Sequence, residues 1–313
     1  MAVNMKGKNL VTLHEWSTEE IWQTIETALA LKMEEKRSQA HPVLAGKQLG
    51  MIFQKPSLRT RVSFEVGMSK LGGHAVYLGP GDIKLGQRET TEDIAKVLSR
   101  YVDVIMARVF GHDIIEELAK HSTVPVINGL SNFAHPTQAL ADLLTIYEKK
   151  RRLEGLKMTF TGDGNNMAHS LLYACAKVGM HLTLAIPEGY HPEEFAIKEA
   201  KEDARKTGAT IEIVTDPHEA VKDADIIYTD VWASMGQEKE HDERVKVFQP
   251  YQVNMDLLKS AREDTIVMHC LPAHYGEEIT LDVVRDPRGQ VVYDEAENRM
   301  HIQMALLSLL THQ

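Results

Sequence analysis

Residues 158–186, MTFTGDGNNMAHSLLYACAKVGMHLTLAI, contain a complete strand–helix–strand pattern. Residues 158–161 predict a buried strand, residues 167–178 a helix and residues 181–186 a second strand. Two strands that are joined by a helix run parallel in one sheet. This segment therefore predicts an α/β fold with helices on both faces of a parallel sheet.

The same alternation extends from this segment in both directions along the chain. Before it, we expect strands at 48–54, 74–78, 104–108 and 124–128, and helices at 59–71, 91–101, 114–121 and from Pro136 onward. After it, we expect strands at 210–214, 226–229 and 265–269, and helices at 192–207, 217–222 and 295–310. Polar loops are expected at 82–88 and 237–246, and Ser17 with Glu20 predicts a capping box at the first helix.

A length of 313 residues exceeds one ordinary core and predicts two domains. We expect each domain to be a parallel sheet flanked by helices, with long helices joining the two. The boundary should lie near the end of the helix that begins at Pro136. The expected domains are residues 1–149 and 150–290, with residues 291–313 as a C-terminal helix that packs back on the first domain.

The composition restricts the class of partner. The net charge of -10 disfavours nucleic acid and anionic membranes, so an anionic ligand requires a local basic cluster. The basic run at 149–152 is interpreted as cations that favour a helix C-terminus. Two cysteines, Cys175 and Cys270, do not make a disulfide framework. With no signal peptide or membrane-spanning stretch recognised, we expect a cytoplasmic protein.

Ligands of such folds bind beyond the carboxyl ends of the strands, where the candidate residues lie. Ser57, Arg59, Thr60 and Arg61 stand at a strand-to-helix turn, although arginine is unfavourable near a helix N-terminus. A bound anion would explain them, because free N–H groups, hydroxyls and guanidinium groups would converge on it. The alternative is a Ser-capped helix whose arginines pair with carboxylates such as Glu65.

Two further strand ends carry residues of the same kind. Arg108 ends a strand, and His135 occupies the N-cap position before Pro136, where histidine is not favoured. A poor cap at such a junction suggests that the imidazole has another task. Arg108 or His135 alone would only weakly indicate a binding site. The indication is stronger because both residues occur at strand ends of the same expected sheet.

The later strand ends carry polar and nucleophilic residues. Residues 162–166 resemble a dinucleotide-binding turn, but Met167 occupies the place of its third glycine. The amides of Asn165 and Asn166 are better suited to a small polar ligand. Asp230 could bind an ammonium group, and Cys270 is either a buried apolar residue or a site residue. A zinc site is not expected, since no second Cys or His pair lies at ligand spacing.

Together these segments resemble the aspartate/ornithine carbamoyltransferase family over nearly the whole chain. The matching segments are residues 57–61, 135–138, Asp230 with 234–236, and 269–272, the last two being similar to the ornithine branch. The resemblance implies a first domain that binds carbamoyl phosphate and a second that binds ornithine. This chain has Leu58 at a position where the family commonly has threonine. In the family, a loop of a neighbouring subunit contributes a donor to the site, and this donor is often glutamine in the ornithine branch. The residue aligned with it in this chain is Lys84, and Gln87 lies nearby in the sequence.

The resemblance also implies the roles of individual residues. Carbamoyl phosphate would be bound by Ser57, Leu58, Arg59, Thr60, Lys84, Arg108, His135, Gln138, Cys270, Leu271 and Arg299. Ornithine would be bound by Asn166, Asp230, Ser234 and Met235. The residues closest to the chemistry would be Arg108, His135, Asp230 and Cys270.

The implied reaction transfers the carbamoyl group from carbamoyl phosphate to the δ-amine of L-ornithine, as in arginine biosynthesis. It requires no metal or organic cofactor. The resemblance implies a homotrimer or an assembly of trimers. Three alternatives stay open: putrescine as the acceptor, an NAD-dependent oxidoreductase that uses residues 162–166, and a silent anion-binding regulator.

Overall fold

The computed structural model of the chain describes residues 2–83, 85, 88–233 and 240–311. The chain forms two compact units. Unit 1 comprises Met1–Leu144 and Asn298–Gln313, and unit 2 comprises Thr145–Glu297. The expected boundaries at 149/150 and 290/291 stay predictions of where the functional domains divide.

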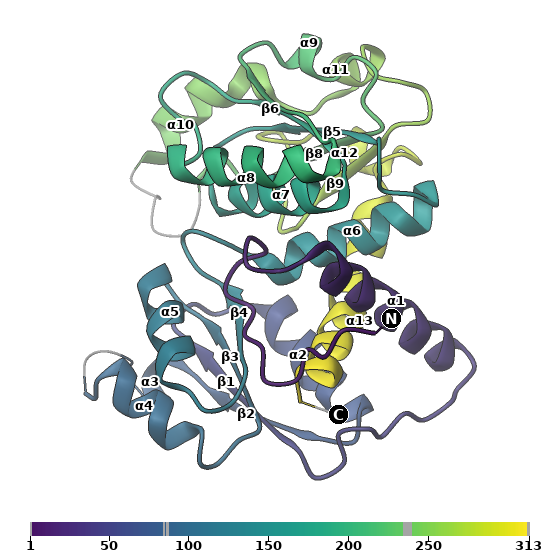
Figure 1. Ribbon diagram of the computed structural model, residues 1–313. Helices are drawn as coiled ribbons and strands as arrows, with labels where there is room; N and C mark the ends of the chain where they lie inside the picture. The colour runs from purple at the N-terminus through teal and green to yellow at the C-terminus, as the bar shows by residue number, and fades with distance from the viewer. Residues whose placement is uncertain (1, 84, 86–87, 234–239, 312–313) are drawn as a thin grey trace. The chain divides into compact units, whose positions relative to one another are not determined.

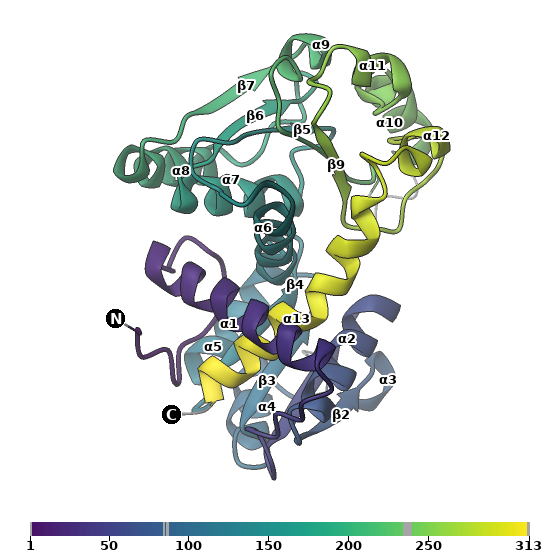
Figure 2. The same ribbon diagram turned by 90° about the vertical axis from the view of Figure 1, so that its right-hand side faces the viewer.

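Unit 1 contains a four-stranded sheet in the order β2-β1-β3-β4, in which all neighbours are parallel. Its strands are β1 (Gln48–Phe53), β2 (His74–Leu78), β3 (Val104–Arg108) and β4 (Val126–Leu130). Its helices are α1 (Thr18–Lys36), α2 (Leu58–Lys70), α3 (Pro80–Ile83), α4 (Thr91–Leu98) and α5 (His112–His121), with part of α6 (Pro136–Lys150) and of α13 (Val291–Thr311). Within unit 1, α1 and α13 lie side by side (Figure 1; Figure 2).

Unit 2 contains a five-stranded sheet in the order β7-β6-β5-β8-β9, again with parallel neighbours. Its strands are β5 (Lys157–Thr161), β6 (His181–Ala185), β7 (Ile211–Val214), β8 (Ile226–Thr229) and β9 (Ile266–His269). Its helices are α7 (Asn166–Val178), α8 (Glu194–Thr207), α9 (Pro217–Ala220), α10 (His241–Phe248), α11 (Met255–Lys259) and α12 (Leu281–Arg285), with the 3₁₀ turn Gln249–Tyr251.

The predicted fold class is confirmed, because both sheets are parallel and flanked by helices. The strand order explains where each unit can bind a ligand. In unit 1 the chain leaves β1 toward β2 and returns to β3, on the other side of β1. In unit 2 it leaves β5 toward β6 and returns to β8. Crevices form at such switch points, just beyond the carboxyl ends of the strands.

Local signals predicted most element starts, and α1 illustrates this. Ser17 accepts a hydrogen bond from the backbone N–H of Glu20, and the Glu20 carboxylate accepts one from the backbone N–H of Ser17. The predicted capping box is therefore confirmed.

Two expected loops contain helices. Residues 80–83 form α3, which overlaps the loop expected at 82–88. Residues 241–246 belong to α10, so the loop expected at 237–246 is wrong over that part, while residues 237–239 lie outside the described residues. The charged surface of α10 suggested a loop, but Arg244 and Phe248 are buried and stabilise the helix through tertiary contacts.

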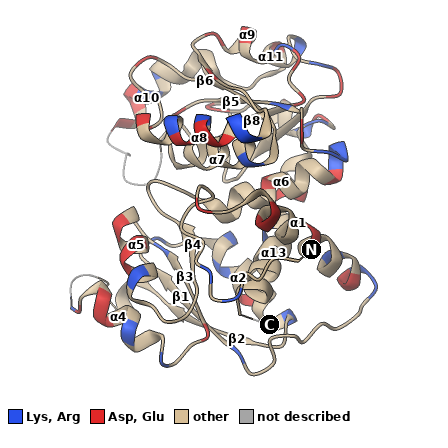
Figure 3. Cartoon of the chain, in the orientation of Figure 1, with Lys and Arg blue, Asp and Glu red and all other residues tan. Residues whose placement is uncertain are grey.

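The basic run that ends α6 is partly neutralised within unit 2. Lys149 forms an ion pair with Asp294, and Lys150 with Asp264 at 3.3 Å. Acidic and basic residues also alternate along α8 (Figure 3).

None of the described helices has both the length and the hydropathy that crossing a bilayer requires.

Candidate active site

The N-terminus of α2 lies at the switch point of unit 1. Ser57 caps the helix by accepting a hydrogen bond from the N–H of Thr60 at 3.3 Å, and its hydroxyl donates to Thr60 Oγ1 at 3.1 Å. Arg61 Nε pairs with Glu65 at 3.3 Å, and its guanidinium stacks on Tyr77. The local-pairing alternative therefore explains Arg61.

Arg59 differs from Arg61 in its surroundings. Arg59 Nε is buried and has no hydrogen-bond partner among the described residues. A buried guanidinium N–H without an acceptor is unfavourable. An anion at the N-terminus of α2 would supply that acceptor, so these surroundings are consistent with the anion-binding interpretation of Arg59, which stays a prediction.

Thr60 lies between two other predicted site residues, Arg299 and Arg108. Its hydroxyl oxygen accepts a hydrogen bond from Arg299 Nη2 at 2.8 Å and lies 3.5 Å from Arg108 Nη1. All three side chains are buried. Arg108 ends β3 directly opposite Phe53 of β1, so the two strands beside the switch point bring these residues together. The structure thus gathers residues that lie far apart in the sequence.

Gln138 extends this group on α6. Its Oε1 accepts a hydrogen bond from Arg299 Nη1 at 2.8 Å, and its Nε2 donates to Asp142 Oδ1 at 2.8 Å. Asp142 was not among the predicted site residues. It lies four residues after Gln138 on α6, so the two side chains share one face of the helix and can form this hydrogen bond. The carboxylate of Asp142 fixes the amide so that its oxygen faces Arg299.

His135 is the last member of this group. Burial lowers the pKa of its imidazole well below the usual value, and the positive charges of three guanidinium groups lower that pKa further. Those groups belong to Arg299, Arg108 and Arg59. His135 is therefore neutral at physiological pH. We call Ser57, Arg59, Thr60, Arg108, His135, Gln138 and Arg299 the cationic cluster.

A second group lies at the switch point of unit 2. Asp230, just after β8, accepts hydrogen bonds from Asn165 Nδ2 at 3.0 Å and from the Cys270 thiol at 3.1 Å. Its own neighbour Val231 donates a backbone N–H to it at 2.8 Å. Three donors therefore hold one carboxylate at the ends of β8 and β9.

Asp163 and Arg244 complete this second group, and sequence reasoning assigned neither a role. Arg244 of α10 forms an ion pair with Asp163 and donates to the carbonyl of Trp232 at 2.5 Å. Burial raises the pKa of the Asp163 carboxyl group. The attraction of Arg244 opposes this rise and the charge of Asp230 adds to it, and the resulting pKa is about 6. We call Asp163, Asn165, Asp230, Arg244 and Cys270 the acidic cluster.

His269 supports the turn that follows β9. Its Nδ1 accepts a hydrogen bond from the N–H of Leu271 at 2.8 Å, so the proton is on Nε2, which donates to Glu278 at 3.0 Å. The ligand atoms of Asp230, His269 and Cys270 lie within 4.8 Å of one another, close enough for a metal ion. However, both ring nitrogens already form hydrogen bonds, which favours a structural role for His269.

The turn at 162–166 does not present the free backbone amides that a pyrophosphate needs. Asn165 caps α7 and accepts hydrogen bonds from the N–H groups of Met167 and Ala168. A side chain at Gly164 would collide with backbone atoms of residues 190–192, so this glycine serves internal packing. The dinucleotide-binding interpretation is not supported here.

Some predicted residues cannot be placed in either cluster. Lys84, Gln87, Ser234 and Met235 lie outside the described residues. Leu58 is the first residue of α2, with an exposed side chain, and Asn166 is the first residue of α7. The roles expected for these residues, and for the carbonyl groups near Cys270 and Leu271, stay predictions.

Comparison with known proteins bears on both units. The model of the aspartate/ornithine carbamoyltransferase carbamoyl-P binding domain matches residues 8–148, and that of the Asp/Orn binding domain matches residues 154–310. The chain belongs to this family. Each cluster lies within the range of one family domain, the cationic cluster apart from Arg299.

Relatives with known names are similar over almost their full length. The ornithine carbamoyltransferase of Pyrococcus abyssi is 57% identical over 99% of this chain and 98% of its own. The solved ornithine carbamoyltransferase of Pyrococcus furiosus is 56% identical with a TM-score of 0.96, covering 99% of this chain and 98% of that one. The anabolic enzyme of Campylobacter jejuni is 37% identical with a TM-score of 0.91, covering 96% and 97%.

Proposed function

We propose that this protein transfers the carbamoyl group of carbamoyl phosphate to the δ-amine of L-ornithine, giving L-citrulline and phosphate. The observation that carries the proposal is the cationic cluster, in which three buried or half-buried arginines surround a neutral imidazole at a switch point. Such a cluster suits a dianionic phosphate with an adjacent carbonyl. Family membership supports the same substrate.

The proposed chemistry depends on charge that develops in the transition state. The neutral δ-amine attacks the carbamoyl carbon and the carbonyl oxygen gains negative charge. The C–O bond to phosphate then breaks, and the proton that the amine nitrogen loses leaves with the phosphate as HPO4²⁻. Arg108 and neutral His135 donate hydrogen bonds to that oxygen. Arg59, Ser57 and the N–H groups of α2 hold the departing phosphate. Preorganised donors of this kind lower the barrier without reorganisation.

The acidic cluster supports an amino-acid acceptor. Asp230 is held by three donors and would bind the α-ammonium group of ornithine. Asn166, Ser234 and Met235 would bind its α-carboxylate. Putrescine has neither group and is the alternative acceptor. Aspartate would need a further cation here to meet its second carboxylate, whereas the arginine of the acidic cluster, Arg244, is already paired with Asp163.

The δ-amine must lose a proton before it attacks. Its pKa in solution is about 10.4, so at neutral pH the reactive form is a small fraction. We expect the rate at saturating ornithine to rise with pH above neutral. A flat profile would show that amine deprotonation does not control the step.

We further propose a cytoplasmic homotrimer, or an assembly of trimers, in which Lys84 or Gln87 reaches the site of a neighbouring subunit. Arginine biosynthesis is the proposed role, since the similar enzymes of P. furiosus and C. jejuni are named anabolic. Dilution to monomers should abolish activity. A fully active monomer would contradict the shared site.

The direct test is to incubate the protein with carbamoyl phosphate and ornithine and to measure citrulline and phosphate together. We expect the two products in equal amounts. Phosphate without citrulline would overturn the proposed transfer. Quenching of NADH fluorescence would instead favour the oxidoreductase alternative.

A further inference from the structure

Arg299 is the member of the cationic cluster that comes from farthest along the chain. It lies on α13, whereas its partners Thr60 and Gln138 lie on α2 and α6. Its two hydrogen bonds form only if α13 has the correct axial position and rotation. The contacts that α13 makes within unit 1 therefore determine where the Arg299 side chain lies.

Two contacts join α13 to α1 on either side of Arg299. Lys32 Nζ donates a hydrogen bond to Asn298 Oδ1 at 2.6 Å, where both side chains are buried. Glu35 Oε2 lies 3.7 Å from Nδ1 of the buried His301. Asn298 immediately precedes Arg299, and His301 follows it by two positions.

Helical spacing gives these two contacts a specific consequence. Lys32 and Glu35 are three residues apart on α1, and Asn298 and His301 are three apart on α13, so each pair shares one face of its helix. Two contacts on one face limit both the sliding and the rotation of α13, and the Lys32–Asn298 hydrogen bond is the stronger, because Glu35 attracts His301 as an ion only when the imidazole is protonated. Arg299 is turned from Asn298 by about 100° around the helix, which directs it toward α2 and α6 instead of α1.

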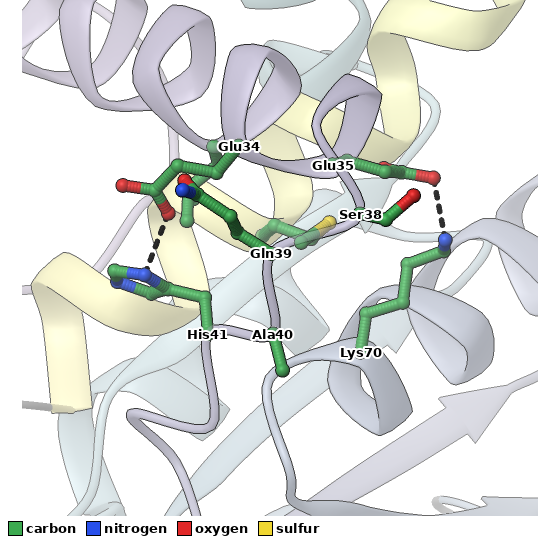
Figure 4. A pocket seen from close by; sticks show the side chains of 9 residues that line it. Glu34, Glu35, Ser38, Gln39, Ala40, His41 and Lys70 are labelled. Carbon is green, nitrogen blue, oxygen red and sulfur yellow. Dashed lines mark hydrogen bonds and ion pairs between the residues drawn. The ribbon is translucent and has the colours of Figure 1, made fainter.

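Contacts with α2 extend this arrangement. Glu35 also pairs with Lys70 at the end of α2, at the edge of a cavity lined by α1, the turn after it and α13 (Figure 4). A Cβ at Gly67 of α2 would lie 3.1 Å from Met304 of α13, so these helices pack closely. The helix that carries Ser57, Arg59 and Thr60 is thus held to the helix that carries Arg299.

We propose that Lys32 and Glu35 are positioning residues, which act through Asn298 and His301 to hold Arg299 in the cationic cluster. Neither residue belongs to the cluster itself. The inference rests on the proposed function, because it assumes that Arg299 binds carbamoyl phosphate. A small displacement of a binding group is enough to weaken substrate binding and catalysis.

The test uses Lys32→Met, which keeps most of the length of the side chain and removes its terminal ammonium group and its hydrogen bond to Asn298. We expect the KM for carbamoyl phosphate to rise about tenfold, with the KM for ornithine unchanged. The control is Lys36→Met, the same change at an exposed position on the same helix, which should leave both KM values unchanged. Equal rises in both KM values for Lys32→Met would indicate general loosening and overturn the proposal.

Combination with Arg299→Ala separates the two proposals. If Lys32 acts through Arg299, the double variant should resemble Arg299→Ala alone, since the effects of coupled residues do not add. Multiplying effects would overturn the positioning role and leave the site intact. An unchanged KM in Arg299→Ala alone would overturn the site assignment instead.

A second variant covers the case in which Lys32→Met does not fold. Glu35→Gln alters a half-exposed side chain and keeps its size. We expect a smaller rise in the KM for carbamoyl phosphate, about threefold, that also disappears in the Arg299→Ala background. No change in KM would contradict the two-point arrangement.

Discussion

Three guanidinium groups surround a neutral imidazole at the switch point of unit 1, whereas at the switch point of unit 2 the carboxylates of Asp163 and Asp230 repel each other and Arg244 pairs with Asp163. Burial acts on both clusters, but it shifts their titrating groups in opposite directions. The pKa of His135 is lowered and that of Asp163 is raised. Each shift favours the neutral form, as expected for groups removed from water.

Two sheets with the same kind of switch point can therefore provide electric fields of opposite sign. The strand order places loops and helix N-termini at each crevice, and the side chains decide the charge of the ligand. A phosphate suits the first cluster and an ammonium group the second.

The largest effect is expected from Arg108→Ala in the cationic cluster. Removing this donor from the developing oxyanion should lower kcat/KM for carbamoyl phosphate by about a thousandfold. The matched control is Arg100→Ala, an exposed arginine of unit 1, which should leave kcat/KM unchanged. Steady-state citrulline formation measures both, and an active Arg108→Ala variant would remove the cationic cluster from the mechanism.

The next effect concerns stability in unit 2. Because the pKa of Asp163 in the folded protein is about 6, above its unfolded value of 3.8, the native state binds the extra proton between these values. Asp163 therefore stabilises the fold below about pH 4, and this contribution, worth about 3 kcal/mol, is lost as pH rises to about 6.

Melting curves of Asp163→Asn against the unmodified protein measure this effect. The deficit in Tm of the variant should be larger at pH 4 than at pH 7. A deficit that is the same at both pH values would mean that Asp163 titrates normally and that burial does not dominate the acidic cluster.

A smaller effect on binding is expected from Asp230→Asn. The amide keeps the size of the side chain but loses its charge, which should raise the KM for ornithine about thirtyfold, or about 2 kcal/mol. The KM for carbamoyl phosphate should stay the same. Asp264→Asn, an exposed aspartate of unit 2, is the control. A rise in the KM for carbamoyl phosphate alone would reverse the assignment of the two clusters.

The smallest effect is the pH dependence contributed by His135. Its folded pKa lies well below the unfolded value of about 6.5, so the unfolded chain gains a proton that the native state does not. Stability is therefore complete above about pH 6.5 and falls by about 1.4 kcal/mol per pH unit below it.

His135→Gln cannot titrate and should not show this loss. The deficit in Tm of the variant should shrink between pH 7 and pH 5, opposite to the trend for Asp163→Asn. Parallel trends in the two variants would show that the clusters do not differ in the way described.

Much of the fold could be predicted because its signals are local. The capping box at Ser17, the polar strand ends and the alternation of strands and helices all lie within a few residues. Helix α10 was missed between 241 and 246 because its charged surface resembles a loop, and the burial of Arg244 depends on Asp163, 81 residues away.

Part of the candidate site could be predicted in its members, with Asp163 and Arg244 as exceptions, but its connections could not. The turn at 57–61 and the ends of β3 and β8 identified Arg59, Arg108 and Asp230. The hydrogen bond from Arg299 to Thr60 spans 239 residues, and no sequence spacing predicts it. The same holds for Lys32 with Asn298, which are 266 residues apart.

The central claim is tested most directly by the acceptor that this protein prefers. Citrulline, carbamoyl-putrescine and carbamoyl-aspartate formation would be measured separately, with carbamoyl phosphate and one acceptor at a time. We expect kcat/KM for ornithine to far exceed the values for putrescine and aspartate. An equal or greater value for putrescine would contradict the role of the acidic cluster, and no product with any acceptor would contradict carbamoyl transfer itself.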